Sequence, residues 1–198
     1  GLNCVATVYN GIDVSSYKFF PTPDAPAYLA FLGRISPEKG PHHAITIAKA
    51  TGIPLKMAGK IDPVDVEYFD REIKHHIDGE FIQFFGEADH QMKNNLMGRA
   101  IATLFPITWR EPFGLVMIES MAAGTPAIAM NLGAVPEVIA HGISGLIVNN
   151  IEEYIVAIKH ISAISRQETR AYVSQHFGVD RMVTDYEIVY RDLLTPKF

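Results

Sequence analysis

The sequence predicts an α/β fold built on a doubly wound, parallel, six-stranded sheet. Short apolar runs alternate with amphipathic stretches from about residue 27 onward. Apolar runs without polar alternation are typical of parallel strands that are covered on both faces. Right-handed crossovers between such strands place helices on both sides of the sheet. The 48% of hydrophobic residues is sufficient to bury such a core.

The expected elements follow one another in regular alternation. Short apolar segments bounded by polar residues or glycine predict six strands, at residues 28–32, 55–58, 81–85, 100–105, 127–130 and 146–148. Helical spacing of apolar residues predicts helices at residues 41–51, 64–76, 90–97, 113–123, 135–140, 152–164, 166–176 and 179–194. Residues 1–8 are mildly apolar and suggest a further short strand. Three prolines within residues 21–26 indicate a connector ahead of the domain.

Composition excludes several classes of protein. The 17 basic and 22 acidic residues give a formal charge of −5, so a global basic field for nucleic acid is absent. Cys4 is the single cysteine, which excludes an intrachain disulfide and a cysteine-rich metal site. No apolar run reaches the roughly 18 residues that cross a bilayer, and no signal peptide is evident. We expect a cytoplasmic protein, with peripheral contact to the inner face of a membrane left open.

The loop after the first predicted strand, residues 33–40, joins two glycines to two cations. Gly33 and Gly40 permit close backbone approach of a ligand, while Arg34 and Lys39 carry charges suited to phosphate oxygens. The loop is not a P-loop, because the G-x-x-x-x-G-K-[ST] pattern is missing. The pattern favours a diphosphate site, with a polar loop of solvated charges as the alternative.

The loop after the fourth predicted strand carries two glutamates eight residues apart. Glu111 precedes the next helix and Glu119 lies within it, roughly 9–10 Å along the axis at 1.5 Å per residue. Pro112 suits the first helical position, and Gly114 leaves the free amides open to an anion. A diphosphate at those amides would leave a sugar near Glu111 and a ribose diol near Glu119. The alternative is a surface glutamate and a first-turn charge favoured by the helix dipole.

The loop after the fifth strand and the histidines carry less information. Gly133 and Ala134 leave room for a ligand, whereas Glu137 is interpreted as structural. The eight histidines show no H-E-x-x-H or comparable spacing, so no metal site is expected.

Taken together, the motifs resemble the C-terminal, donor-binding half of GT-B glycosyltransferases, in particular the retaining family 4. Residues 9–13 (YNGID) are similar to the "PNGVD" interdomain hinge of that family. Residues 31–34 (FLGR) with 38–40 (EKG) are similar to its "vGRl…eKG" loop, and residues 111–119 match its E-x7-E motif. Residues 121–126 (MAAGTP) and Gly133 with Pro136-Glu137 are similar to "EAMA-G-PV" and "GG-PE". The resemblance runs from about residue 8 to residue 148.

The resemblance implies roles for individual residues. Arg34, Lys39 and Glu111 would be catalytic: the cations would bind the donor diphosphate and Glu111 the donor sugar. Glu119 would hold the ribose, and the base would lie near residues 85–87. The remaining donor-binding positions would be Gly33, Gly86, Phe113, Gly114 and Leu115. The family is retaining, and it is usually metal-independent and needs no cofactor beyond the nucleotide-sugar substrate.

The resemblance also implies a domain arrangement. Residues 1–24 would be the end of an N-terminal domain with the hinge, and residues 25–198 a Rossmann-like domain for a nucleoside-diphosphate sugar. An N-terminal acceptor domain, supplied in cis, would be absent here, so the fragment alone is expected to be inactive in hexosyl transfer. Pro112 and Thr108-Trp109 depart from the usual motif and leave the sugar open. The acceptor is equally open. The alternatives are a non-catalytic nucleotide-binding module and a nucleotide-sugar epimerase; the E-x7-E spacing beside the Arg/Lys loop favours transferase over epimerase.

Overall fold

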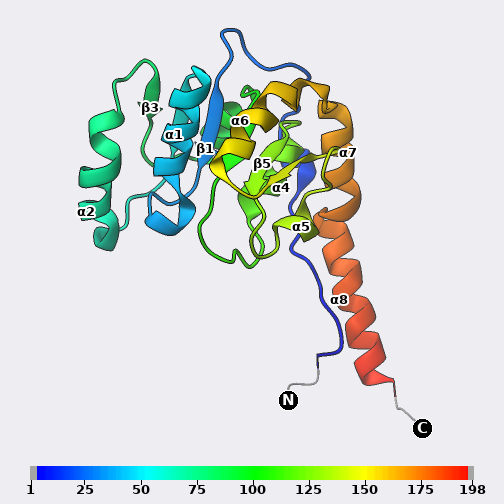
Figure 1. Cartoon of the computed structure of the whole chain (residues 1–198). Helices are drawn as coiled ribbons and strands as arrows, with labels where there is room; N and C mark the ends of the chain where they lie inside the picture. The colour runs from blue at the N-terminus through cyan, green and yellow to red at the C-terminus, as the bar shows by residue number, and fades with distance from the viewer. Residues whose placement is uncertain (1–3, 196–198) are drawn as a thin grey trace.

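A computed structural model describes residues 4–195 and contains one parallel sheet of six strands (Figure 1). The strand order is β3-β2-β1-β4-β5-β6. The strands are β1 (Leu29–Leu32), β2 (Leu55–Ala58), β3 (Ile82–Phe84), β4 (Ala102–Phe105), β5 (Ala127–Met130) and β6 (Gly145–Val148). Every pairing is parallel, with Leu29 opposite both Leu55 and Ala102. The predicted doubly wound sheet is confirmed, and its order reverses between β1 and β4.

Helices cover both faces of this sheet. On one face α1 (Pro41–Thr51) and α6 (Ile151–His160) pack together over β1, β2, β5 and β6. On the other face α3 (His90–Gly98), α4 (Leu115–Ala122) and α7 (Arg166–His176) form a contiguous layer. The short helix α5 (Val135–Val138) follows β5. Leu29, Phe31, Leu55 and Leu104 are almost fully buried between the layers, which explains why the strands lack polar alternation.

The structure corrects three local expectations. Residues 64–76 do not form one α-helix: a 3₁₀ turn (Pro63–Asp65) leads into α2 (Val66–Tyr68), a π-helical turn (Phe69–Ile73) and a 3₁₀ turn (Lys74–His76). Helix α4 begins at Leu115 with Gly114 as its N-cap, so Pro112 lies before the helix and not at its first position. Residues 4–8 form no strand, and residues 1–3 lie outside the described residues.

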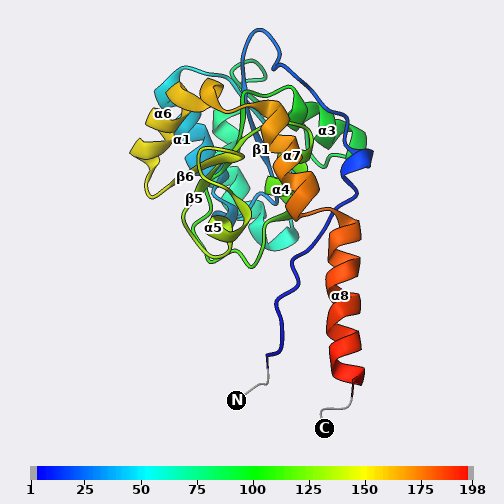
Figure 2. The same ribbon diagram turned by 90° about the vertical axis from the view of Figure 1, so that its right-hand side faces the viewer.

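The N-terminal segment around residues 9–12 and the last helix lie side by side at one end of the molecule. Helix α8 (Val179–Leu194) projects away from the sheet, with the N-terminal segment running beside its first half (Figure 2). Arg181 donates a hydrogen bond to the Tyr9 carbonyl oxygen at 2.8 Å, and Ile12 bridges to Gly178. No residue of α8 is buried. None of the helices within residues 4–195 combines the length and apolar character needed to cross a membrane.

Candidate functional site

The loops that follow the carboxyl ends of β1, β4 and β5 lie in close backbone contact with one another. A Cβ on Gly40, whose φ is 71°, would lie 2.0 Å from the Pro106 carbonyl oxygen. A Cβ on Gly133, whose φ is 60°, would lie 2.2 Å from the Glu111 carbonyl oxygen. The Thr108 amide also donates to the Glu38 carbonyl oxygen at 3.0 Å. The β1, β4 and β5 loops therefore meet at the point where the strand order reverses, which is where open α/β sheets bind ligands.

Glu111 and Lys39 form an ion pair at this meeting point. The Lys39 Nζ donates to Glu111 Oε2 at 2.5 Å, and the Trp109 Nε1–H donates to the same oxygen at 2.9 Å. Glu111 is 7% exposed, whereas Trp109 is 38% exposed. The Ala134 amide donates to the Glu111 carbonyl oxygen at 2.9 Å, which fixes the main chain at this residue. Two loops that the sequence analysis treated separately thus supply one compact polar cluster.

Arg34 lies on the β1 loop but takes different partners. Its guanidinium contacts Glu38 at 2.9 Å and Asp62 at 3.6 Å, and nearly half of its side chain is exposed. A hydrogen bond from Lys60, together with the charges of Lys60 and Arg34, lowers the pKa of Asp62 below its ordinary value. Exposed ion pairs of this kind are weak, so Arg34 can exchange its carboxylate partners for a ligand at little cost.

A cavity of about 210 Å³ opens beside Arg34 at the carboxyl ends of β1, β2 and β3. It is lined by residues from five segments: Leu32, Gly33, Arg34, Gly59, Lys60, Glu87, Ala88, Lys93 and Val116. Gly59 is required there, since a Cβ would lie 1.7 Å from the Gly33 carbonyl oxygen. Three of the lining side chains are cationic and one is acidic, so the cavity favours an anionic ligand although the whole chain is acidic.

Glu119 lies on the same helix face as the cavity-lining Val116, three residues away. Its Oε1 accepts a hydrogen bond from the Tyr17 hydroxyl at 3.0 Å. Burial, with the charge and hydrogen bond of Glu119, raises the pKa of Tyr17 well above its ordinary value. The phenol therefore stays protonated and donates to Glu119, while the Tyr17 ring packs against His90 with centroids 4.7 Å apart.

The other predicted donor-binding residues fall into two groups. Gly114 and the exposed Leu115 lie at the start of α4. Gly86 lies in the loop that follows β3 and has a φ of 70°. The Phe113 side chain is instead buried against Tyr9 and Phe177, so only its main chain is available to a ligand. Glu137, interpreted as structural, accepts a hydrogen bond from the Tyr9 hydroxyl at 2.7 Å.

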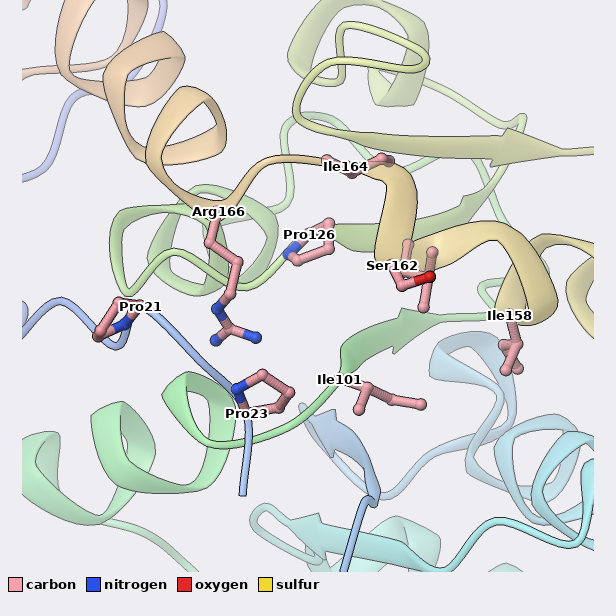
Figure 3. A pocket seen from close by; sticks show the side chains of 9 residues that line it. Pro21, Pro23, Ile101, Pro126, Ile158, Ser162, Ile164 and Arg166 are labelled. Atoms are coloured by element: carbon pink, nitrogen blue, oxygen red, sulfur yellow. The ribbon is translucent and has the colours of Figure 1, made fainter. Parts of the chain in front are cut away.

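A cavity of about 410 Å³ lies at the opposite, amino-terminal edge of the sheet (Figure 3). Its wall is mostly proline and isoleucine, and its charged residue is Arg166. The guanidinium points between Pro21, Pro23 and Pro126. It donates to the carbonyl oxygens of Phe20 at 2.8 Å and Ala100 at 2.9 Å, and also to Gly98 and Thr125. Desolvation lowers the pKa of Arg166 to about 10.

Three site residues escaped the sequence analysis. The motifs mark Trp109 only as a departure from the family pattern, do not single out Tyr17, and place Lys93 only in a predicted helix. Tyr17 lies 102 residues from Glu119 in the sequence, so no local pattern connects them. Lys93 lies among other polar residues of α3, so the sequence pattern gives no signal that it lines a cavity. Within residues 4–195, no group of three or more His, Cys, Asp or Glu side chains is arranged to hold a metal ion.

Comparison with known sequences gives a consistent family match. The model of the family described as "Glycosyl transferases group 1" matches residues 16–176. A glycogen synthase of Mycobacterium tuberculosis is 34% identical over 153 residues, which cover 74% of this chain and 36% of that protein. A phosphatidyl-myo-inositol mannosyltransferase of Mycolicibacterium smegmatis is 29% identical over 149 residues, covering 70% of this chain and 37% of that protein. The chain thus spans little more than a third of these relatives.

Solved structures share the fold at lower identity. AviGT4, a glycosyltransferase of avilamycin A biosynthesis, superposes with a TM-score of 0.81 at 23% identity, covering 98% of this chain and 60% of AviGT4. Anabaena HepE, solved in complex with UDP and glucose, gives 0.79 at 20% identity, covering 94% and 57%. The C-terminal domain of a group 1 glycosyl transferase from Francisella tularensis gives 0.63 at 22% identity, covering 89% and 98%.

Proposed function

Because this chain belongs to the group 1 glycosyl transferases, we propose that it binds the nucleoside-diphosphate sugar of a retaining hexosyltransferase. The observation that carries the proposal is the Lys39–Glu111 ion pair ahead of α4, on the same carboxyl edge of the sheet as the cavity lined by Arg34, Lys60 and Lys93. A diphosphate needs cations and amides, and a sugar needs a fixed carboxylate to accept its hydroxyl protons. Both requirements are met within one loop cluster.

Each part of the donor has a proposed contact. Arg34 and Lys39 bind the diphosphate, helped by Gly33 and by the amides near Phe113, Gly114 and Leu115 at the positive end of α4. Glu111 accepts from the sugar and Glu119 from the ribose, while the base enters beside Gly86, Glu87 and Lys93. Lys93 forms no ion pair with any residue from 4 to 195, so its ammonium is available to the nucleotide.

Transfer requires the bond between the anomeric carbon and the diphosphate oxygen to break. Arg34, Lys39 and the α4 amides stabilise the negative charge that develops on the departing diphosphate, which is the role a metal ion fills in other transferases. We therefore propose metal-independent transfer with retention of the anomeric configuration. Turnover in the presence of a chelator, and the anomeric proton coupling of the product, test these two points.

The acceptor is proposed to bind to a second domain that this chain does not supply. Support comes from α8, which carries exposed apolar side chains along its free part, among them Tyr186, Tyr190 and Leu193. A surface of that kind is normally covered in a folded protein. We also propose that residues 1–24 contain the end of the N-terminal domain and the hinge, and that the site is incomplete without an acceptor domain. A cytoplasmic location is a further part of the proposal.

Calorimetry with UDP, GDP and ADP tests donor binding by this chain. We expect heat with one nucleoside diphosphate and a clear loss of affinity in Glu119→Ala, which removes the ribose contact. Glu111→Gln is the matched control with the corresponding nucleoside as ligand, because that variant keeps the proposed ribose contact and a nucleoside has no phosphate for Lys39 to bind. Absence of heat with all three nucleotides rejects the proposed function, and sugar transfer by the 198-residue chain alone rejects the need for a second domain.

A further inference from the structure

One carboxylate oxygen of the candidate site has two side-chain donors of different kinds. Glu111 Oε2 accepts from the Lys39 ammonium at 2.5 Å and from the Trp109 indole N–H at 2.9 Å. The Lys39 Nζ also lies 5.0 Å from the centroid of the indole ring. Glu111 itself is 7% exposed, so water replaces neither donor fully.

The proposed function requires Lys39 at a second anion. If Lys39 turns to the donor diphosphate, Glu111 loses its cation while still buried. A buried carboxylate without a donor is strongly unfavourable. The indole N–H is a neutral hydrogen-bond donor, so the charge of a phosphate does not attract it away from Glu111. Its position is set by the same loop that holds Glu111. It can keep the carboxylate in place after Lys39 has left.

We propose that Trp109 is a positioning residue that holds Glu111 in the site while Lys39 moves from Glu111 to the donor diphosphate. The inference rests on the proposed function of this site. It predicts that Trp109 supports diphosphate affinity without touching phosphate, because it stabilises the carboxylate that Lys39 leaves behind. When no nucleotide sugar is bound, Lys39 pairs with Glu111 and the carboxylate keeps both of its hydrogen-bond donors.

A neutral residue at position 111 separates this role from a purely structural one. Glutamine at 111 needs no cation, so Lys39 is free in that variant and the indole N–H is no longer required. The effect of removing the indole N–H must then vanish in the Glu111→Gln background. A ring that only filled space would be needed equally in both backgrounds.

Calorimetry of UDP, GDP and ADP binding to the parent chain, Trp109→Phe, Glu111→Gln and the double variant tests the proposal. Phenylalanine keeps an aromatic ring beside Lys39 but removes the N–H together with the second ring of the indole, so the double variant is needed to separate the two losses. We expect Trp109→Phe to weaken diphosphate binding by about tenfold, the scale of one hydrogen bond to a charged group, and the double variant to match Glu111→Gln. An unchanged affinity in Trp109→Phe, or an equal loss in both backgrounds, overturns the proposal.

Fluorescence gives a second readout, because Trp109 is the only tryptophan of the chain. Removal of the ammonium from the indole face should change its emission on saturation with the nucleoside diphosphate and not with the nucleoside. Lys39→Met should show the altered emission before any ligand is added. Unchanged emission at nucleotide concentrations that calorimetry shows to be saturating contradicts the movement of Lys39. If no nucleotide binds to the parent chain, the proposed function falls, and this inference falls with it.

Discussion

The two edges of the sheet use cations in opposite ways. At the carboxyl edge Arg34 and Lys39 pair with the carboxylates of Glu38, Asp62 and Glu111. At the amino edge Arg166 donates to main-chain carbonyl oxygens and to the Thr125 hydroxyl. Arg170, one turn further along α7, likewise donates to the carbonyl oxygens of Val14, Tyr17 and Ala122.

This difference separates the cations that we propose to bind a ligand from structural ones. A cation paired with a carboxylate side chain can exchange that partner for a phosphate, whereas a guanidinium that joins several carbonyl groups cannot leave without depriving them of their donor. The amino-edge cavity of about 410 Å³ is larger than the carboxyl-edge cavity of about 210 Å³, yet its arginine is already bonded. Arg166 and Arg170 instead hold the segment of residues 14–20 against the domain.

The largest expected effect is on stability, at the amino edge. Arg166→Ala leaves the carbonyl oxygens of Phe20 and Ala100 without these donors, and each stranded group costs about 1–3 kcal/mol. We expect the free energy of unfolding to fall by about 3 kcal/mol or more, measured by urea denaturation. Arg34→Ala is the matched control and should lower it by less than about 1 kcal/mol, since its pairs are exposed. Equal losses in both variants would erase the distinction between the two edges.

The next effect is on ligand binding, at the carboxyl edge. Arg34→Ala should weaken the nucleoside diphosphate by roughly tenfold or more, because a charged hydrogen bond contributes about 1.5–3 kcal/mol. The corresponding nucleoside should bind as before. Calorimetry with both ligands measures the two affinities. If nucleoside and diphosphate weaken alike, Arg34 does not contact the phosphates.

Most of the fold could be predicted from the sequence, but only part of the candidate site could. Apolar strands such as residues 127–130 and helices such as residues 41–51 were predicted at their observed bounds, because burial on both faces leaves a strong local signal. The single helix predicted for residues 64–76 and the predicted start of α4 were wrong. There, packing against α1 and the left-handed conformation of Gly114 override helical periodicity.

The side-chain partnerships lay beyond the sequence for a different reason. The Lys39–Glu111 pair joins residues 72 positions apart, and the Tyr17–Glu119 bond joins residues 102 apart. Motif order placed these glutamates in one loop and helix, but which donor reaches which oxygen depends on how the β1, β4 and connector segments meet.

A smaller effect is expected where the connector reaches the candidate site. Tyr17→Phe removes the hydroxyl that donates to Glu119 and leaves the ring against His90. If that bond orients Glu119 toward a ribose, nucleoside and nucleoside diphosphate should weaken alike by about threefold, less than the loss of a charged hydrogen bond to the ligand itself, because Tyr17 acts only through Glu119. Calorimetry with the same two ligands measures this. A loss of affinity confined to the diphosphate would assign Tyr17 to the phosphate side of the site. It would contradict the proposal that Arg34 serves the phosphates and Glu119 the ribose.

The smallest expected effect concerns two carboxyl-edge residues in the first turn of α1. Burial, and for His42 also the charge of His43, lowers the pKa of both histidines below the ordinary value of 6.5. The unfolded chain then binds more protons than the folded chain as the pH falls below about 6.5, so the free energy of unfolding should decrease there. Urea denaturation at pH 7.5 and 5.5 measures the decrease, and His43→Gln should reduce it. An equal decrease in His43→Gln and the parent would exclude His43 as its source and would move the pH sensitivity away from the start of α1.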